Sequence, residues 1–199
     1  MKKSLLLGVA AAALLAVGLV TVHAADQTLP TVGQVAPGFT LPSQDGSQIS
    51  LSSFAGKWVV LYFYPKDATT GCTIEAHKFQ DALPQFEAKN AVILGVSVDT
   101  PDSHQQFCTK EGLTFRLLAD PGHGVVTAYG SLGNFGPMTI ANRNTFLIDP
   151  TGKIAQIWTK VNPQTSASDV LAAIPAGPSP TSVDSVKPPQ SDPSIKSMK

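Results

Sequence analysis

A continuous apolar run at Trp58–Tyr64 restricts the folds open to this chain more than any other feature of the sequence. A strand that is apolar at every position is typical of a sheet with both faces covered. Two further apolar runs, Ala91–Val98 and Asn144–Ile148, predict additional strands. A fourth strand, Lys153–Trp158, follows the turn at 149–152 and is expected to form a hairpin with the third.

Helical segments are expected between and after these strands. Phe79, Leu83 and Phe86 lie at helical spacing between the first two strands. Pro84 falls inside this helix and is expected to kink it. The other helical segments expected are a short helix through Lys110, capped by Asp102 or Ser103, and helical turns at Val125–Tyr129 and Ser168–Ile174. Strands that alternate with helices predict an α/β sandwich whose sheet ends in an antiparallel hairpin.

The first 24 residues, Met1–Ala24, are typical of a secretory signal peptide removed after Ala24. A basic start precedes the apolar run Leu5–Val20, and Val22 and Ala24 occupy positions −3 and −1 before the cleavage. The run is also long enough for an uncleaved membrane anchor, which stays as the alternative. In both cases the remainder of the chain is expected on the export side, in the oxidising periplasm.

The last residues have the composition of a disordered tail. Pro175–Lys199 contains six prolines and six serines but few sizeable apolar side chains. Such a segment cannot bury enough surface to offset the entropy lost on ordering. We therefore expect one domain at 25–175 and a disordered tail at 176–199.

The composition excludes several classes of function. Fourteen basic residues balance fourteen acidic ones, and removal of the leader leaves a mildly acidic chain, so no nucleic-acid partner is indicated. Two cysteines are too few for a disulfide-rich mini-domain or for a zinc site made of cysteines alone. The sequence has no Gly-rich phosphate loop and no Cys-x-x-Cys motif, and no cofactor is expected.

Cys72 is the candidate nucleophile. Residues 65–72 leave the first strand through a polar, glycine-containing turn and lead into a helix. A cysteine in the first turn of a helix faces unpaired backbone N–H groups and the positive end of the helix dipole, and both favour the thiolate. Because the thiolate is the nucleophilic form, this position favours a reactive cysteine over a buried structural one.

The segment Pro65-x-x-x-Thr69-x-x-Cys72 resembles the active-site motif of the peroxiredoxins, the thiol-dependent peroxidases. The resemblance runs from about Val32 to Ile174, and further motifs resemble the bacterioferritin-comigratory, or PrxQ, branch of that family. These motifs are Gly33-x-x-Ala36-Pro37-x-Phe39-x-Leu41, Leu61–Asp67, Gly71-Cys72-Thr73-x-Glu75-Ala76, Ser103-His104-x-x-Phe107, Leu117–Asp120 and Arg143-x-Thr145-Phe146-x-Ile148-Asp149. The resemblance implies a thioredoxin-like fold with a central mixed β-sheet flanked by helices, which agrees with the alternation of strands and helices.

The resemblance also implies catalytic roles for four residues. Cys72 would be the peroxidatic thiolate, and Thr69 would bring its hydroxyl to the sulfur and to the peroxide. Arg143 would approach from across the sheet to hold the thiolate and to stabilise charge that develops on the O–O bond. Pro65 would shape the pocket and shield the sulfur from water. Taken singly, Thr69 would be a loop cap, Arg143 a surface cation and Pro65 a strand terminator. Glu75 would either orient Arg143 or be a free surface glutamate.

The second cysteine, Cys108, lies thirty-six residues after Cys72. Many PrxQ-like proteins carry a resolving cysteine five residues after the peroxidatic one, where this chain has His77. The resemblance implies the other PrxQ arrangement, in which the sulfenic acid of Cys72 condenses with Cys108 on the next helix to a redox disulfide. Since bridged cysteines need Cα atoms within about 7 Å, local unwinding is expected first. An inert Cys108 beside Phe107 and a permanent structural disulfide stay as alternatives.

The histidines suggest weaker sites. His104 and Cys108 are four residues apart and could share a helix face, with His77 as a further candidate ligand. Two ligands do not make a metal site, and no metal is expected. His123, between two glycines, is expected to be a solvated turn residue.

The resemblance implies a peroxide substrate, a thioredoxin-like protein reductant in the same compartment, and a monomer. The segment 131–142 departs from the family pattern and is expected near the peroxide entrance, so the sequence does not rank peroxides. Two other classes of function stay open. One is an exported thiol–disulfide oxidoreductase, although Glu75 stands where Cys-x-x-Cys needs its second cysteine. The other is a non-enzymatic binding module with a structural Cys72–Cys108 disulfide.

Overall fold

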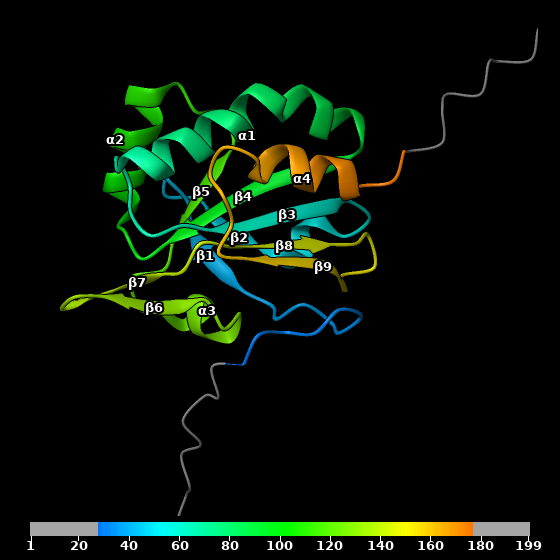
Figure 1. Ribbon diagram of the computed structural model, residues 1–199, viewed down its shortest axis with the longest axis horizontal. Coiled ribbons are helices and arrows are strands. Elements are labelled where there is room, and N and C mark those ends of the chain that lie inside the picture. The colour runs from blue at the N-terminus through cyan, green and yellow to red at the C-terminus, as the bar shows by residue number, and fades with distance from the viewer. Residues whose placement is uncertain (1–27, 177–199) are drawn as a thin grey trace, which may run out of the picture.

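The computed structural model describes residues 28–176 (Figure 1). The signal peptide and nearly all of the tail predicted from the sequence lie outside these residues. Within the described part, no helix is both long and apolar enough to cross a membrane.

A five-stranded mixed sheet forms the centre of the domain, in the order β5-β4-β3-β8-β9 (Figure 1). Its strands are β3 (Trp58–Phe63), β4 (Ala91–Ser97), β5 (Arg116–Ala119), β8 (Asn144–Ile148) and β9 (Ile154–Thr159). The strands β3, β4 and β5 run parallel, whereas β8 pairs antiparallel with β3 and β9 pairs antiparallel with β8. The four strands and the closing hairpin predicted from the sequence are confirmed.

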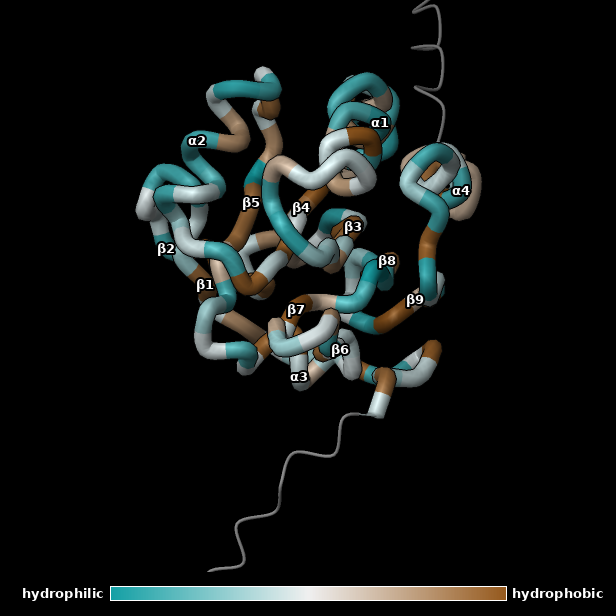
Figure 2. The backbone as a smooth tube through the Cα atoms, turned by 60° about the vertical axis from the view of Figure 1, so that its left-hand side comes forward, coloured by the Kyte–Doolittle hydropathy of each residue, from teal (hydrophilic) through white to brown (hydrophobic). Residues whose placement is uncertain are grey.

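Helices cover one face of this sheet. They are α1 (Thr70–Ala88), α2 (Pro101–Glu111) and α4 (Ser166–Ala173). The other face carries the short α3 (Gly124–Ala128), the 3-10 turn η1 (Leu51–Phe54) and the N-terminal segments. Figure 2 shows that the most apolar stretches of the chain lie in the central strands, with hydrophilic stretches outside them.

The sheet separates two apolar clusters, because alternate residues of a strand point to opposite faces. Tyr62 and Tyr64 belong to the cluster under α1, α2 and α4, which also contains both cysteines. Leu61 and Phe63 belong to the cluster on the other face. The run Trp58–Tyr64 is therefore apolar throughout because each face of β3 meets its own core.

Several elements differ from the sequence-based expectation. Five strands were not predicted: β5, and two hairpins made of β1 (Thr40–Pro42) with β2 (Gln48–Ser50) and β6 (Leu132–Phe135) with β7 (Met138–Ala141). The hairpin strands are three or four residues long and partly polar, so their pattern is too short to identify.

The expected cap of α2 was wrong. The helix begins at Pro101, and the side chain of Thr100 accepts a hydrogen bond from the backbone N–H of Ser103 at 3.3 Å. Proline suits the first helical position because its missing N–H would have had no partner there. Pro84 lies inside α1, which continues as one helix to Ala88.

Candidate active site

Cys72 lies where the sequence places it, in the first turn of α1 beyond the end of β3. The residue is buried, with 2% of its surface exposed, and its thiol is free. The segment between β3 and α1 runs along the edge of the sheet at which the parallel strands end. This edge is where α/β sheets commonly place reactive side chains.

Arg143 reaches Cys72 from across the sheet. Because β8 runs antiparallel to β3 with Asn144 opposite Phe63, Arg143 lies at the edge where β3 ends. Its Nη2 donates a hydrogen bond to the Sγ of Cys72 at 3.3 Å. A Cβ atom on Gly71 would lie 3.3 Å from the same Nη2, so the glycine leaves room for the guanidinium.

Glu75 anchors the other side of the guanidinium. Its side chain is fully buried, and Oε2 accepts a hydrogen bond from Arg143 Nη1. Of the two alternatives that the sequence left open, the pairing with Arg143 is the one present. Burial raises the pKa of Glu75, and the charge of Arg143 offsets part of that rise. Glu75 Oε1 and Ser166 Oγ of α4 are both buried without a hydrogen-bond partner.

Thr69 and Pro65 lie in the loop between β3 and α1, and neither forms a hydrogen bond to the sulfur. Thr69 precedes α1, and its hydroxyl donates to the backbone carbonyl of Lys66 at 3.0 Å. The expectation that the Thr69 hydroxyl contacts the sulfur is therefore not met in this state, because the loop carbonyl takes its proton. Pro65 is half-buried and lines a hollow of about 330 Å³ together with His123 and Met138.

Cys108 lies in the body of α2, on the same side of the sheet as Cys72. Its thiol is free and buried, with 7% of the residue exposed. Burial raises the pKa of Cys108 to about 11, and the charge of Asp67 acts in the same direction. The two cysteines thus occupy two separate, fully formed helices that pack on one apolar cluster.

The remaining histidines do not form a common site. His77 Nε2 lies 2.9 Å from Glu111 Oε2 and so links α1 to the end of α2. His104 is fully buried and contacts Asp67 instead of Cys108. His123 is partly exposed in the turn before α3, as expected. Among residues 28–176, no three His, Cys, Asp or Glu side chains are arranged to hold a metal ion.

Comparison with known proteins decides the family. The AhpC/TSA family model matches residues 32–157. The protein named peroxiredoxin Bcp of Xanthomonas campestris is 41% identical over 147 residues, which cover 71% of this chain and 92% of that protein. Peroxiredoxin Bcp of Bacillus subtilis is 40% identical over 147 residues, covering 72% and 94%. The chain is a peroxiredoxin.

Solved structures place this peroxiredoxin in the Bcp/PrxQ branch and confirm its thioredoxin-like fold. A cysteine-to-serine mutant of Xylella fastidiosa PrxQ superposes with a TM-score of 0.69 at 35% identity, covering 73% of this chain and 95% of that chain. The bacterioferritin comigratory protein of Xanthomonas campestris superposes with a TM-score of 0.65 at 38% identity, covering 68% and 89%.

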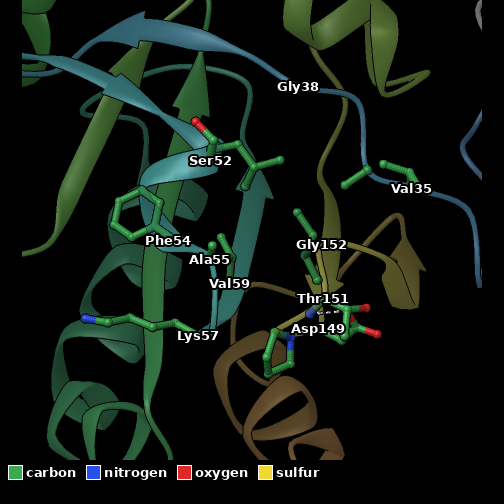
Figure 3. A pocket seen from close by; sticks show the side chains of 14 residues that line it. Val35, Gly38, Ser52, Phe54, Ala55, Lys57, Val59, Asp149, Thr151 and Gly152 are labelled. Atoms are coloured by element: carbon green, nitrogen blue, oxygen red, sulfur yellow. Dashed lines mark hydrogen bonds between the residues drawn. The ribbon is translucent and has the colours of Figure 1, made fainter.

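The peroxiredoxin also has an apolar cavity of about 310 Å³ far from Cys72 (Figure 3). Its walls come from η1, from Lys57 just before β3 and Val59 at the start of that strand, and from the turn at 149–152. Cys72 follows the opposite end of β3, and a strand of this length spans about 20 Å. The cavity therefore does not belong to the thiol site.

One group of buried polar residues beside the site was not predicted from the sequence. Asp67 accepts hydrogen bonds from Tyr64, Ser103 and His104. All four residues fall within the motifs that carry the family resemblance, but no local pattern in the sequence indicates that they bond to one another.

Proposed function

We propose that this peroxiredoxin is a thiol-dependent peroxidase that reduces hydrogen peroxide and organic hydroperoxides to water and alcohols. The observation that carries the proposal is the 3.3 Å hydrogen bond from Arg143 Nη2 to Cys72 Sγ in the first turn of α1. A permanent cation and a helix N-terminus both favour the thiolate over the thiol.

In the first step, the Cys72 thiolate attacks one oxygen of the peroxide. The S–O bond forms as the O–O bond breaks, and the second oxygen leaves as water or alcohol after it takes a proton. Arg143 is placed to stabilise the charge on the O–O bond, since its guanidinium already lies at the sulfur. Preorganised donors of this kind supply much of the rate enhancement of enzymes.

Three neighbours support this step. Glu75 accepts a hydrogen bond from Nη1 of Arg143 and so keeps Nη2 directed at the sulfur. Thr69 exchanges its bond to the Lys66 carbonyl for a bond to the sulfur or to the incoming peroxide. Pro65 shapes the approach to the sulfur and limits the access of water.

In the second step, the Cys108 thiol condenses with the sulfenic acid of Cys72, which forms the disulfide and releases water. Both thiols are buried in intact helices, and a disulfide needs Cα atoms within about 7 Å. Local unwinding of α1, of α2 or of both therefore precedes the bond. A dithiol protein reductant of the thioredoxin type then returns both cysteines to thiols.

The comparisons support peroxide as the substrate. The Xanthomonas campestris bacterioferritin comigratory protein is described as having alkyl peroxide reduction activity. We extend that class of substrate to this chain, together with hydrogen peroxide. The hairpin β6–β7, which departs from the family pattern, presents the exposed side chains of Phe135 and Met138 near the hollow that contains Pro65.

Stopped-flow consumption of peroxide by the mature, reduced protein tests the proposal. One equivalent of peroxide should be consumed without any reductant, and intact mass should fall by about two units as the disulfide forms. Cys72→Ser should abolish both results while the protein stays folded, because oxygen replaces sulfur in the same shape. Retention of peroxide turnover in Cys72→Ser would refute the assignment.

Cys108→Ser tests resolution separately. The first attack should proceed at the wild-type rate, because Arg143 and Cys72 are untouched. The product should then remain a sulfenic acid or dimerise through Cys72, and turnover with a protein reductant should collapse. Normal cycling would mean that this enzyme uses one cysteine. Disulfide exchange on protein substrates without peroxide consumption would favour a thiol–disulfide oxidoreductase, and neither activity would favour a binding module.

We also propose that the protein is exported to the periplasm and acts there as a monomer. The support is the basic and apolar pattern of Met1–Ala24, with small residues before Ala25. N-terminal sequencing of the cell-associated protein should find Ala25 as the first residue, in a periplasmic fraction. Full-length protein in the membrane fraction would favour the uncleaved anchor.

A further inference from the structure

A second cluster of polar groups, buried except for the partly exposed Ser103, lies next to the thiol site and takes no part in the chemistry proposed above. We call it the Asp67 cluster, and its members are Tyr64, Asp67, Ser103 and His104. Asp67 accepts hydrogen bonds from the Tyr64 hydroxyl at 2.7 Å, from the Ser103 hydroxyl at 2.7 Å and from His104 Nδ1 at 2.8 Å. Asp67 is 7% exposed and His104 is fully buried.

The cluster joins the two segments that carry the cysteines. Tyr64 and Asp67 belong to the stretch between β3 and α1 that leads to Cys72, whereas Ser103 and His104 lie in the first half of α2. Figure 1 shows α2 beside the beginning of α1. Cys108 follows His104 by four residues, so the two side chains share one face of α2.

The Asp67 carboxylate accepts three hydrogen bonds, whereas one nitrogen of His104 has no hydrogen-bond partner. Burial acts to raise the pKa of Asp67, but the bonds from His104, Ser103 and Tyr64 hold it below its usual value, so the carboxylate is ionised. Hydrogen bonds to a charged acceptor are stronger than neutral ones. His104 Nε2, in contrast, is buried without a partner, which is unfavourable while α2 is docked and is relieved by water once α2 unwinds.

We propose that the Asp67–His104 hydrogen bond is a latch that holds α2 in its docked, helical position and thereby sets the rate at which Cys108 reaches oxidised Cys72. The proposal rests on the two-cysteine mechanism above and makes His104 a positioning residue that acts through Cys108. Docked α2 keeps the Cys108 thiol buried and away from the sulfenic acid. Release of His104 frees the turn that contains Cys108.

The latch decides between two fates of the sulfenic acid. In one, Cys108 condenses with it, which gives the disulfide and water. In the other, a second peroxide oxidises it to the sulfinic acid and is itself reduced to water or alcohol. The first reaction waits for α2 to unwind, whereas the second does not. A tighter latch therefore favours sulfinic acid at high peroxide, and a looser latch favours the disulfide.

The key variant is His104→Leu, which keeps much of the side-chain volume and removes the hydrogen bond. Disulfide formation, followed by rapid-quench intact mass, should accelerate by about tenfold or more, in line with the loss of one hydrogen bond to a charged group. The peroxide concentration that gives half sulfinic acid should rise by a similar factor. The rate of the first attack should stay within about twofold of wild type, because the Cys72–Arg143 contact does not involve the cluster.

Two further variants separate the latch from general loosening of α2. His104→Asn places an amide N–H near the position of Nδ1 and should restore most of the wild-type rate. Glu111→Gln weakens the link to His77 at the other end of α2 and should change resolution by less than about twofold, as expected for a partly exposed pair. If His104→Leu does not fold, Ser103→Ala, which removes one of the three bonds, should accelerate resolution by a smaller factor.

Each outcome has one meaning. An unchanged resolution rate and unchanged sulfinic threshold in His104→Leu would overturn the latch, as would equal acceleration in Glu111→Gln. A wild-type protein that consumes no peroxide would instead refute the proposed function. A wild-type protein that reacts once but forms no Cys72–Cys108 disulfide would refute the two-cysteine mechanism.

Discussion

The guanidinium of Arg143 lies between the thiol of Cys72 and the carboxyl group of Glu75. Its Nη2 is 3.3 Å from Cys72 Sγ, and its Nη1 donates a hydrogen bond to Glu75. The two contacts use different nitrogens of one planar group, so the position of one partner fixes the direction available to the other. Cys72 and Glu75 are three residues apart on α1 and face the same side of the helix. The helix α1 thus carries both groups that bind Arg143, the residue directly before β8.

Arg143→Ala should slow the reaction of the protein with peroxide by about 100-fold or more, because it removes the preorganised donor at the sulfur. Single-turnover stopped-flow kinetics on the fully reduced protein measure the rate of the first attack separately from disulfide formation. A rate equal to that of wild type would show that the contact of Arg143 with Cys72 does not contribute to the attack on peroxide.

Glu75→Gln should separate stability from activity. The raised pKa of Glu75 means that its folded form holds a proton more strongly than its unfolded form. Its contribution to stability is therefore greatest below the unfolded pKa of about 4.3 and falls as pH rises through the folded pKa. At neutral pH a neutral glutamine should keep or raise the Tm, and its amide can donate to the unpartnered Ser166 Oγ.

The same variant should react with peroxide about tenfold more slowly, because the carboxylate that binds Arg143 becomes a neutral amide oxygen and the ion pair is lost. Thermal unfolding at neutral pH and single-turnover kinetics give the two readouts. A lower Tm together with an unchanged rate would show that Glu75 serves the fold and does not orient Arg143.

Gly71→Ala should disturb the guanidinium from its other side. The new Cβ would lie 3.3 Å from Arg143 Nη2, so the guanidinium would have to shift by a few tenths of an ångström. Since small displacements of catalytic groups are costly, we expect the attack on peroxide to slow by about tenfold. Gly122→Ala is the matched control, because its added Cβ would meet no atom within 4 Å, and it should react at the wild-type rate.

Much of this site could be predicted from the sequence, for a physical reason. The apolar run Trp58–Tyr64 identifies a buried strand, and the polar turn that follows places Cys72 in a helical first turn. The partner strand that begins after Arg143 was also recognised from its apolar run. Antiparallel pairing of these two strands is then sufficient to bring Arg143 to Cys72.

Other parts depended on contacts that no local pattern records. A glutamate such as Glu75 is usually exposed, and only the packing of α1 on the sheet and on α4 buries it. The bond between His104 and Asp67 joins residues thirty-seven positions apart and exists only because α2 docks beside the loop. Thr69 illustrates the opposite failure, because the motif implies a contact with the sulfur whereas a nearby carbonyl, that of Lys66, takes its hydroxyl proton.

Thr69→Val should slow the first attack by about 100-fold, since valine keeps the shape and removes the hydroxyl that we assign to the reacting complex. Thr69→Ser retains the hydroxyl and should stay near the wild-type rate. A normal rate in Thr69→Val, together with a lower Tm, would mean that the hydroxyl of Thr69 serves only to bond the Lys66 carbonyl.

Alkaline pH should loosen α2 through Cys108. Burial raises the pKa of this thiol to about 11, and the charge of Asp67 adds to the rise. A solvated thiol ionises near about pH 8.5. The docked helix is therefore at full stability below the unfolded pKa and loses stability as pH rises from there towards the folded pKa, because only the unwound segment releases the proton. Local unwinding of α2 should become more frequent across this window.

Hydrogen exchange of the α2 amides in the reduced protein, compared with Cys108→Ser at each pH, measures this effect. Chemical exchange accelerates with pH equally in both proteins, so the ratio of their rates isolates the thiol. The ratio should be flat below about pH 8.5 and should then rise, by up to about tenfold per pH unit, which is the limit for one titrating group. Amides of α4 serve as the internal control, and their ratio should stay flat. A flat ratio for α2 up to pH 10 would show that Cys108 ionises without release of the helix, and resolution would then need no unwinding of α2.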